Sequence, residues 1–365
     1  MKVAIVHEWL DSYAGSERVL EQMLLCYPDA ELFVLCDFLA EGQRGFLHGK
    51  VPHTSFLQRM PFARRMFRNY LQLMPIAIEQ FEMRGFDLVL SSSHAVAKGV
   101  VTGPGTRHVS YIHSPMRYAW DLQGQYLRQS GSEGGLKGAY TRWLLHRLRL
   151  WDQASASRPD KLLANSRYIA ERIRKTWRRE AEVLHPPVDV AGFPMGTAPR
   201  THFVVASRQV PYKRVELVAE AFRRMPDLPL LIAGDGPSAP LVAKAAEGAP
   251  NIQVLGRVSQ PKLVELVQTA RAFVFAAEED FGIALVEAQA AGTPLICYGR
   301  GGAADIVREG ETGLLFPDQS VDSIVNAVRE FVREEARFHP TVCRLHAEDF
   351  SAEKFRERLL RAVAA

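Results

Sequence analysis

The sequence predicts an α/β protein made of two doubly wound domains in tandem. Short β-branched runs alternate with amphipathic helical stretches along the whole chain, which is typical of parallel sheets. The 365 residues exceed what one hydrophobic core usually supports, and a stretch rich in Pro and Gly interrupts the alternation near the middle. We therefore expect one domain on each side of that stretch.

The first half contains runs with strand character separated by helical patterns. The expected strands are Val3–Val6, Glu31–Leu35, Leu88–Ser91, Arg107–Ile112, Lys161–Ala164 and Glu182–Leu184. Apolar residues recur with the helical period in three stretches, which we expect to be helices: Ser16–Cys26, Phe62–Leu71 and Ala139–Ala156.

Residues 185–187 and 192–199 carry several Pro and Gly residues and show no period, so they indicate a linker. We place the boundary there, with a first domain over residues 1–190 and a second over residues 191–349. In the second domain the expected strands are His202–Ala206, Leu230–Ala233, Ile252–Leu255, Ala272–Ala276, Pro294–Cys297 and Gly313–Phe316. A last amphipathic stretch covers Ala352–Val363.

The composition excludes several classes of protein. Apolar residues make up 47% of the chain and charged residues 24%, as in soluble globular proteins and not in disordered, collagen-like or disulfide-stapled chains. No apolar run is long enough to cross a bilayer, and the first one ends at His7 and Glu8, so no signal peptide is expected. The 4 cysteines show no C-x-x-C spacing, which argues against a zinc site or a disulfide framework and favours a reducing cytoplasm.

The charge balance is mildly basic. The net charge of +4 is low for a nucleic-acid-binding protein, so no nucleic-acid partner is expected. It suits anionic small molecules or an anionic membrane surface.

The loops that follow the strands are where chemistry is expected, because doubly wound sheets bind ligands at the carboxyl ends of their strands. The richest loop covers residues 277–294. Glu279 lies just before a predicted helix that Gly282 opens, and Glu287 lies in its second turn. Two carboxylates can bind the vicinal diols of two sugars, and the helix N-terminus favours a phosphate. The loop therefore suits a nucleotide sugar, with capping acids and a solvated glutamate as the alternative.

Two basic residues follow the first strand of the second domain. Arg208 and Lys213 lie in the loop Ala206–Arg214. The guanidinium offers a planar fork to phosphate oxygens and the ammonium a compact charge, so together they can neutralise a diphosphate leaving group. Solvated basic residues near a helix start are the alternative.

A glycine-rich turn, Gly299–Asp305, follows the strand Pro294–Cys297. It can be a phosphate-binding nest, a dinucleotide fingerprint with Asp318 beyond the next strand, or a plain turn. The fingerprint belongs in the first strand–helix turn of its sheet, whereas this turn lies near the end of its domain, which disfavours the dinucleotide interpretation.

The first domain offers two further candidates. His113 ends the strand Arg107–Ile112 beside a proline and several aromatic residues, which favours a shaped pocket over a purely structural histidine. Gly15 follows the first strand and can bring a helix N-terminus close to phosphates, unless the turn is a plain one capped by Ser16. His94 and Lys98 are weaker candidates.

Several motifs are missing from the sequence. No two aspartates are separated by a single residue, so the D-x-D pattern that holds a metal and a diphosphate is absent. With Arg208 and Lys213 available for the phosphates, we expect no metal requirement. Nucleophile elbows and Walker loops are absent as well.

Taken together, these loops resemble the family-4 glycosyltransferases, which are retaining sugar transferases of the GT-B fold. The matching segments are A-G-S-E-R-V at residues 14–19, I-H-S-P-M-R-Y at 112–118, S-R-Q-V-P-Y-K-R at 207–214, E-D-F-G-I-A-L-V-E at 279–287 and G-R-G-G-A at 299–303. The resemblance extends over nearly the whole chain. Two departures are Ala14, where many members have a second Gly, and Asp305, where Glu is common.

The resemblance implies two Rossmann-like domains that face a central cleft, with the C-terminal helix, residues 350–365, packing back on the first domain. It also implies a role for each matching residue. Glu279 would bind the donor sugar, Glu287 the ribose, and Arg208 with Lys213 the diphosphate. His113 would touch the transferred sugar near the reacting centre. The expected donor-binding positions are Gly15, Arg208, Lys213, Val258, Glu279, Phe281, Gly282, Ile283 and Glu287.

The amino-acid sequences of the loops that contain His113 and Glu279 most resemble those of bacterial mannosyltransferases of O-antigen and exopolysaccharide assembly. This implies GDP-mannose as donor and a lipid-linked saccharide as acceptor. A UDP-sugar donor, a nucleotide-sugar epimerase and a non-catalytic nucleotide-sugar-binding module remain alternatives.

Two basic stretches rich in apolar and aromatic residues, Phe56–Tyr70 and Arg142–Trp151, suit helices on anionic lipid. The alternative is that their apolar residues are core and their arginines solvated. We therefore expect a cytoplasmic protein that can dock on the inner face of the membrane.

Overall fold

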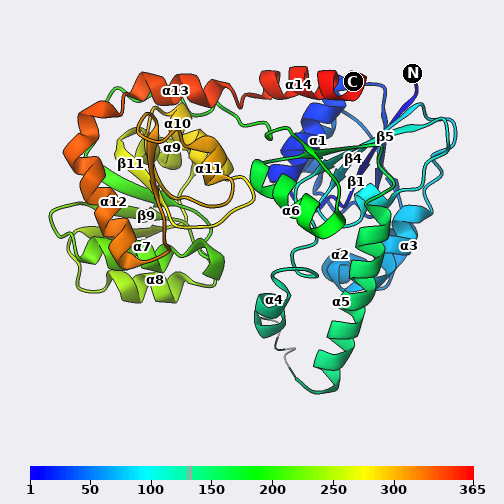
Figure 1. Ribbon diagram of the computed structural model, residues 1–365, viewed down its shortest axis with the longest axis horizontal. Coiled ribbons are helices and arrows are strands. Elements are labelled where there is room, and N and C mark those ends of the chain that lie inside the picture. The colour runs from blue at the N-terminus through cyan, green and yellow to red at the C-terminus, as the bar shows by residue number, and fades with distance from the viewer. Residues whose placement is uncertain (130, 132–133) are drawn as a thin grey trace. The chain divides into compact units, whose positions relative to one another are not determined.

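Figure 1 shows the computed structural model, which describes residues 1–129, 131 and 134–365. The chain divides into two compact units. Unit 1 contains Met1–Pro186 and Phe355–Ala365, and unit 2 contains Pro187–Lys354. The division falls slightly before the expected boundary at residue 190, because Val188 and Val190 are already packed in the core of unit 2.

The described residues of unit 1 form one parallel sheet of 7 strands in the order β3-β2-β1-β4-β5-β6-β7. The strands are β1 (Val3–His7), β2 (Glu31–Val34), β3 (His53–Thr54), β4 (Leu88–Ser93), β5 (Arg107–Ile112), β6 (Lys161–Ala164) and β7 (Glu182–Val183). Sequence analysis missed β3, whose 2 residues are too few to show a period. The strand order reverses between β1 and β4, which is the switch point of this sheet.

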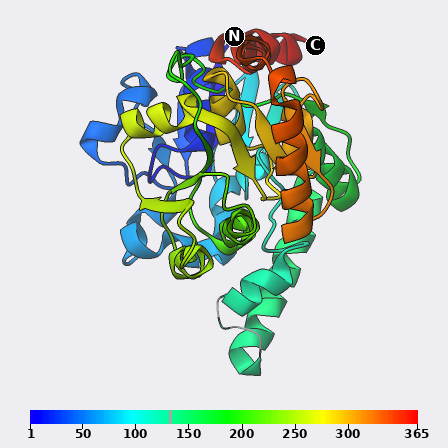
Figure 2. The same ribbon diagram turned by 90° about the vertical axis from the view of Figure 1, so that its left-hand side faces the viewer.

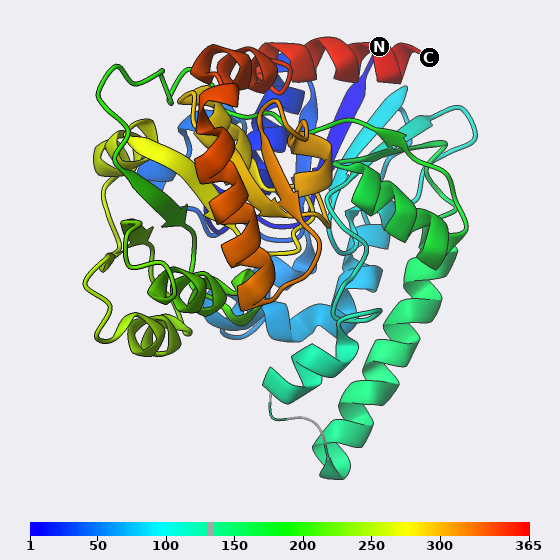
Figure 3. The ribbon, with the colours of Figure 1, turned by 60° about the vertical axis from the view of Figure 1, so that its left-hand side comes forward.

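Helices cover both faces of that sheet (Figure 1). Their bounds are α1 (Gly15–Cys26), α2 (Ala63–Met66), α3 (Met74–Glu79), α4 (Gln123–Gln129), α5 (Gly135–Ser155), α6 (Arg167–Trp177) and α14 (Ala352–Ala364). Alternate residues of β1 face opposite sides. Ile5 packs with α1 and with α14, whereas Ala4 packs with α3 and α5. The N-terminal half of α5 extends beyond the sheet (Figure 3).

The expected helix over Phe62–Leu71 is wrong as a continuous element. Phe62 has a left-handed backbone with φ of 55°, α2 contains only 4 residues, and the chain continues as a 3₁₀ stretch over Phe67–Leu73 with a non-helical Tyr70. The apolar residues that suggested a helix are divided between the core, which holds Ala63 and Phe67, and the surface, which holds Phe62. The sequence period therefore did not come from one buried helix face.

The described residues of unit 2 form a second parallel sheet, with 6 strands in the order β10-β9-β8-β11-β12-β13. The strands are β8 (His202–Ala206), β9 (Leu230–Ala233), β10 (Ile252–Gly256), β11 (Ala270–Phe275), β12 (Leu295–Tyr298) and β13 (Gly313–Phe316). The order reverses between β8 and β11. Both sheets therefore have the Rossmann-like arrangement that the sequence predicted.

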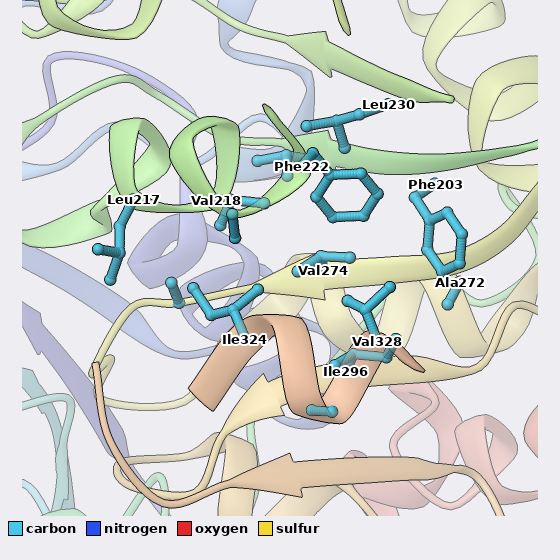
Figure 4. Packing of buried hydrophobic residues seen from close by; sticks show 14 of the residues in the cluster. Phe203, Leu217, Val218, Phe222, Leu230, Ala272, Val274, Ile296, Ile324 and Val328 are labelled. Carbon is cyan, nitrogen blue, oxygen red and sulfur yellow. The ribbon is translucent and has the colours of Figure 1, made fainter. Parts of the chain in front are cut away.

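Two layers of helices enclose the second sheet, and Figure 2 turns this unit toward the viewer. One face carries α7 (Val215–Arg223), α8 (Ala239–Ala246) and α12 (Val321–Glu334), and the other carries α9 (Gln260–Gln268), α10 (Ile283–Ala290), α11 (Ala303–Ile306) and α13 (Pro340–Glu348). Figure 4 shows the first of these faces. Phe203, Val274 and Ile296 project from the strands toward Phe222 of α7 and Val328 of α12. Among the described residues, no helix has the length and apolar character needed to cross a bilayer.

Candidate functional site

The candidate residues gather at the switch points of the two sheets. In unit 2 the loops after β8 and β11 start from neighbouring strands and run to opposite sides of the sheet. Such a reversal opens a crevice at the carboxyl ends of the strands. Arg208 and Lys213 lie on the first of these loops and Glu279 on the second.

Lys213 and Glu279 form an ion pair across this switch point, between Nζ and Oε1. Their side chains are 12% and 20% exposed, so both charges are largely withdrawn from water. The ammonium also lies 5.1 Å from the ring centroid of Phe275, the last residue of β11. The sequence predicted that these residues share one site, and the structure brings the two side chains into contact.

Arg208 lies on the same loop but remains exposed, and no described residue forms an ion pair with it. Its neighbour Gln209 points inward instead. The amide of Gln209 donates to the carbonyl oxygen of Gly234 at 2.9 Å, and its backbone N–H donates to the carbonyl oxygen of Asp235 at 2.9 Å. Arg208 is therefore an exposed cation on a loop that the two hydrogen bonds of Gln209 fix in place.

The supporting loop after β9, Gly234-Asp235-Gly236, was missed in the sequence analysis. A Cβ atom on Gly234 would lie 1.9 Å from the carbonyl oxygen of Ser207, and one on Gly236 would lie 2.3 Å from that of Gln209. Both glycines also have positive φ, of 119° and 156°. Two glycines around an aspartate directly after a predicted strand are the signal that could have found it.

The Gly299–Asp305 turn supports the Glu279 loop. The N–H of Gly302 donates to the carbonyl oxygen of Glu279 at 2.8 Å, and Gly301 pairs with Glu279 in an isolated parallel bridge. A Cβ atom on Gly302 would lie 2.2 Å from Cα of Phe281. These contacts show that the glycines allow two backbones to touch, as a plain tight turn requires; the phosphate-nest and dinucleotide interpretations stay predictions.

The helix that follows Glu279 begins where the sequence predicted. Gly282 has φ of 101° and is the residue before α10, an 8-residue helix. Glu287 is half-buried in its second turn. Phe281 is buried with its ring centroid 5.8 Å from that of Phe350, so its backbone is the part left to meet a ligand. Ile283 is half-buried at the start of α10.

Val258 follows β10, where the strand ends at Gly256 with φ of 65°. Its side chain is half-buried against the core face that also holds α9 and α10. The loop at Val258 therefore starts at the carboxyl end of β10 in the same unit. The N–H of Gly234 donates to the carbonyl oxygen of Gly256 at 2.7 Å, which joins this loop to the Gly234–Gly236 loop.

In unit 1, His113 follows β5, the strand next to β4 at the switch point. Its Nε2 lies 2.8 Å from Oγ of Ser92 on β4. Burial, together with the positive charges that His94 and His7 can carry, lowers the pKa of His113 to about 3. His113 is therefore a neutral imidazole at physiological pH.

Gly15 opens α1, and Ala14 is its N-cap. The N–H of Ala14 donates to Oε2 of Glu17 at 3.0 Å, and the hydroxyl of Ser16 donates to the same oxygen at 3.0 Å. Glu17 rather than Ser16 thus closes the first turn, contrary to the plain-cap alternative. Gly15 lies at a helix N-terminus at the carboxyl end of β1.

Three charged side chains of unit 1, Glu8, Lys98 and Asp152, are buried. The carboxylate of Glu8 accepts hydrogen bonds from the backbone N–H groups of residues 94–97, at 2.7 to 3.0 Å. Lys98, a weak candidate for ligand binding, has its Nζ 2.6 Å from Oδ1 of Asp152, and the two side chains are 1% and 0% exposed. Lys98 therefore points into the interior and is part of the support of this end of the sheet.

Among the residues that the structure describes, no group of three or more His, Cys, Asp or Glu side chains is arranged to hold a metal ion. The 4 cysteines are free thiols.

Two family models match the chain. Residues 13–191 match the model of Glycosyltransferase Family 4, and residues 198–344 match that of Glycosyl transferases group 1. A D-inositol 3-phosphate glycosyltransferase of Mycobacteroides abscessus is 30% identical over 241 residues, which are 58% of this chain and 54% of the relative. The chain thus spans about half the length of this curated relative.

Two solved structures have the same fold. Anabaena HepE in complex with UDP superposes with a TM-score of 0.72 at 14% identity, and the comparison covers 100% of both chains. The lipopolysaccharide outer core galactosyltransferase WaaB, in its apo form, gives a TM-score of 0.69 at 17% identity over 100% of this chain and 99% of the other. The two family models follow one another over nearly the whole chain, and both units have Rossmann-like sheets. The chain therefore belongs to the glycosyltransferases of the GT-B fold, with a family 4 unit followed by a group 1 unit.

Proposed function

We propose that this protein is a retaining hexosyltransferase that uses a nucleotide-sugar donor. The observation that carries the proposal is the contact of Lys213 with Glu279 at the switch point of unit 2. A cation suited to a diphosphate and a carboxylate suited to sugar hydroxyls lie side by side there, as a nucleotide sugar requires. The solved HepE structures, one with UDP and one with UDP-glucose, support a donor of this class.

In this proposal the diphosphate lies between Arg208, Lys213 and the N-terminus of α10. The exposed guanidinium of Arg208 and the ammonium of Lys213 provide charge-assisted hydrogen bonds, and the backbone at Gly282 provides N–H groups. Binding frees Glu279 from part of its ion pair, so that its carboxylate can accept from hydroxyls of the transferred sugar.

Four further residues of unit 2 complete the donor site in this proposal. Glu287 binds the ribose, while Val258 with its loop meets the base. Phe281 and Ile283 flank Gly282, in the turn that carries the Glu279 carboxylate and meets the phosphates of the donor. Each of these positions lies on a loop or helix start at the carboxyl end of a strand of unit 2, which supports the assignment.

In the reaction we propose, the bond from the anomeric carbon to the phosphate oxygen breaks as the acceptor oxygen attacks from the same face. The negative charge that develops on the diphosphate is stabilised by Arg208 and Lys213. The departing phosphate oxygen takes the proton of the acceptor hydroxyl, so atoms and charge balance without a metal ion. For unit 1 by itself, we propose that neutral His113 and the N-terminus of α1 at Gly15 are the groups that bind a ligand.

For the donor we propose GDP-mannose and for the acceptor a lipid-linked saccharide of bacterial surface-polysaccharide assembly. The sequences around His113 and Glu279 support this choice. A UDP-sugar is the competing donor, because the HepE structures hold UDP. The curated relative is described as a D-inositol 3-phosphate glycosyltransferase, so inositol phosphate belongs among the acceptors to be tested.

The test is calorimetric unfolding in the presence of GDP-, UDP- and ADP-sugars, each with and without EDTA. A ligand that binds the native state raises its unfolding temperature. We expect GDP-mannose to give the largest shift and EDTA to leave it unchanged. Absence of a shift with every nucleotide sugar would contradict the proposal, and loss of the shift in EDTA would contradict metal independence.

Product analysis then separates the remaining enzyme classes. A transferase releases the nucleotide diphosphate and labels the acceptor. An epimerase changes the donor sugar without any acceptor, and a binding module gives a thermal shift without turnover.

We also propose that unit 1 docks on anionic membrane at the inner face of the cytoplasmic membrane. Exposed apolar side chains occur in both basic stretches, with Phe62 76% and Trp143 57% exposed. Just outside the stretches, the hydroxyl of Tyr140, which is 52% exposed, donates to Oε1 of Gln72 at 2.6 Å, so an end of one stretch lies near an end of the other. The exposed arginines around them are Arg64, Arg65, Arg142 and Arg147. Basic residues beside exposed aromatic ones favour an anionic lipid surface.

Flotation with anionic liposomes tests the docking. We expect binding that weakens as salt rises, and Phe62→Ser and Trp143→Ser should each reduce it. Leu241→Ser, at a residue that is 57% exposed on unit 2, is the matched control. Equal flotation of all variants, or no flotation at low salt, would contradict the proposal.

A further inference from the structure

A chain of hydrogen-bonding groups runs through unit 1 at its switch point. It starts at His113, whose Nε2 lies 2.8 Å from Oγ of Ser92. The same Oγ lies 3.1 Å from Nδ1 of His7, and Nε2 of His7 lies 3.3 Å from Oε1 of Glu17. His7, Ser92 and Glu17 are all buried. The chain therefore connects the first turn of α1 with the end of β5.

The Glu17 end of the chain accepts hydrogen bonds only. Burial raises the pKa of this carboxyl, but hydrogen bonds from His7 and Ser16 and the positive charge that His7 can carry outweigh it and lower the pKa to about 2. An ionised carboxylate has no proton to donate. Nε2 of His7 must therefore carry a hydrogen that points at Glu17.

The direction of every other bond follows from this one when His7 is neutral. Nδ1 of His7 then has no hydrogen, so it accepts from the hydroxyl of Ser92. That hydroxyl has a single hydrogen, so its oxygen is left to accept from Nε2–H of His113. Because His113 is neutral, its Nδ1 carries no hydrogen.

The Nδ1 atom of His113 is the open end of the chain. No described residue bonds it, and it is not among the unbonded polar atoms that are fully enclosed. His113 itself is half-buried. A ligand can therefore reach this atom.

We propose that Glu17, His7 and Ser92 are positioning residues that hold the single proton of His113 on Nε2, so that Nδ1 meets its ligand as an acceptor. Given the proposed function, that ligand is a hydroxyl group of a sugar, which donates its hydrogen to Nδ1. A second proton on His7 would reverse the two bonds of the Ser92 hydroxyl and turn Nδ1 of His113 into a donor, while Nε2–H of His7 would still donate to Glu17. The chain thus decides whether Nδ1 of His113 accepts a hydrogen bond from its ligand or donates one.

Other charged or titratable groups surround the two histidines. Glu17 faces His7 from α1, His94 follows β4 and lies 6.3 Å from His113 between ring centroids, and Tyr111 of β5 lies 5.1 Å from it. Glu8 at the end of β1 and Arg117 beyond β5 act on His94. The variants below leave Glu8, His94, Tyr111 and Arg117 unchanged.

The test is the tautomer of His113, measured by long-range ¹H–¹⁵N correlation on the full-length chain with ¹⁵N-labelled histidine. The signal is assigned by its loss in His113→Gln. At pH 7.5 and without ligand we expect the Nε2–H form. Detection of the Nδ1–H form in the wild type would overturn the proposal.

Two variants make the test specific. Glu17→Gln introduces an amide that can donate to His7, so we expect the Nδ1–H form of His113 to appear. Ser92→Ala breaks the chain and should produce a mixture of both forms. The matched controls are Glu21→Gln, a half-buried carboxylate on α1 to which the Tyr13 hydroxyl donates at 2.7 Å, and Ser110→Ala, a buried serine that Ser91 bonds at 2.7 Å. An unchanged tautomer in both test variants would overturn the proposal.

Kinetics give the second measurement. Ser92→Ala should lower kcat/KM by about tenfold, the size expected for one lost hydrogen bond, while Ser110→Ala leaves it near the wild-type value. Equal losses in both variants would indicate a structural role only. The tautomer is measured without substrate, so failure of the transferase proposal would leave that result standing.

Discussion

The two switch points have the same strand order, but the charged side chains near them differ in their exposure to water. In unit 2, Lys213 and Glu279 pair at the rim of the sheet, and Arg208 remains exposed beside them. In unit 1 the charges of Lys98, Asp152 and Glu8 are buried.

The difference shows how one topology can serve two kinds of recognition. A buried charge needs a fixed partner, because removing the charge from water is costly. Such a pair stabilises the fold, and neither member can give up its partner to bind a ligand. The rim pair in unit 2 keeps some contact with water and can exchange its partner. Unit 2 is therefore suited to an anionic ligand, and unit 1 to neutral hydroxyl groups.

The largest expected effect is on the stability of unit 1, from Lys98→Met. The variant leaves the Asp152 carboxylate buried without its cation, which should lower the free energy of unfolding by about 3–5 kcal/mol. All 5 tryptophans lie in unit 1, so urea unfolding followed by tryptophan fluorescence reports on this unit alone. Lys2→Met, which removes an exposed pair with Glu31, is the control and should cost less than about 1 kcal/mol. Similar losses in the two variants would refute a distinct role for burial.

Lys213→Ala should show the opposite behaviour, with a large kinetic effect and a small effect on stability. Loss of one group that stabilises developing charge should lower kcat by about 10²–10³-fold. Lys262→Ala on α9 removes an exposed ammonium that pairs with Glu265 and should leave kcat unchanged. Steady-state turnover of both variants checks this. Wild-type turnover by a folded Lys213→Ala protein would exclude the phosphate role.

Glu17 should make the stability of unit 1 depend on pH. The pKa of this carboxyl falls from 4.5 to about 2 in the folded chain, so it stabilises the fold above pH 4.5 and loses that contribution as the pH falls toward 2. The shift corresponds to about 3 kcal/mol. We expect Glu17→Gln to be less stable than the wild type at pH 7, and the gap to close in acid. Urea unfolding at several pH values measures it, and a gap independent of pH would contradict the assignment.

The smallest expected effect concerns the backbone support of Glu279. In Gly302→Ala the new methyl group would lie 2.2 Å from Cα of Phe281, so the Glu279 loop must move. We expect a loss of about 1–3 kcal/mol in stability together with weaker donor binding. In Gly299→Ala the methyl group meets its nearest neighbours at 3.5 Å, an ordinary contact, which makes it the matched control. Calorimetry with and without donor compares them, and equal donor affinity in both variants would count against the support role.

The sequence by itself determined the two α/β units, the positions of most strands and the loops that carry the candidate residues. These features depend on local patterns, namely short buried runs, helical periods and glycines at turns. Each such pattern is contained within a short segment of the sequence. The placement of Glu279 just before a helix opened by Gly282 is of this kind. The interrupted segment Phe62–Leu71 shows the limit, because its apolar residues are divided between core and surface.

Only the tertiary structure decided which side chains touch. Lys213 and Glu279 are 66 residues apart, and His7 and Ser92 are 85 residues apart. Each pair meets because the order of the strands places two distant loops side by side, and strand order does not follow from local periodicity. The same reason explains why the support by Gly234 and Gly302 was not foreseen: a glycine that lets two backbones touch is visible only when both backbones are in place.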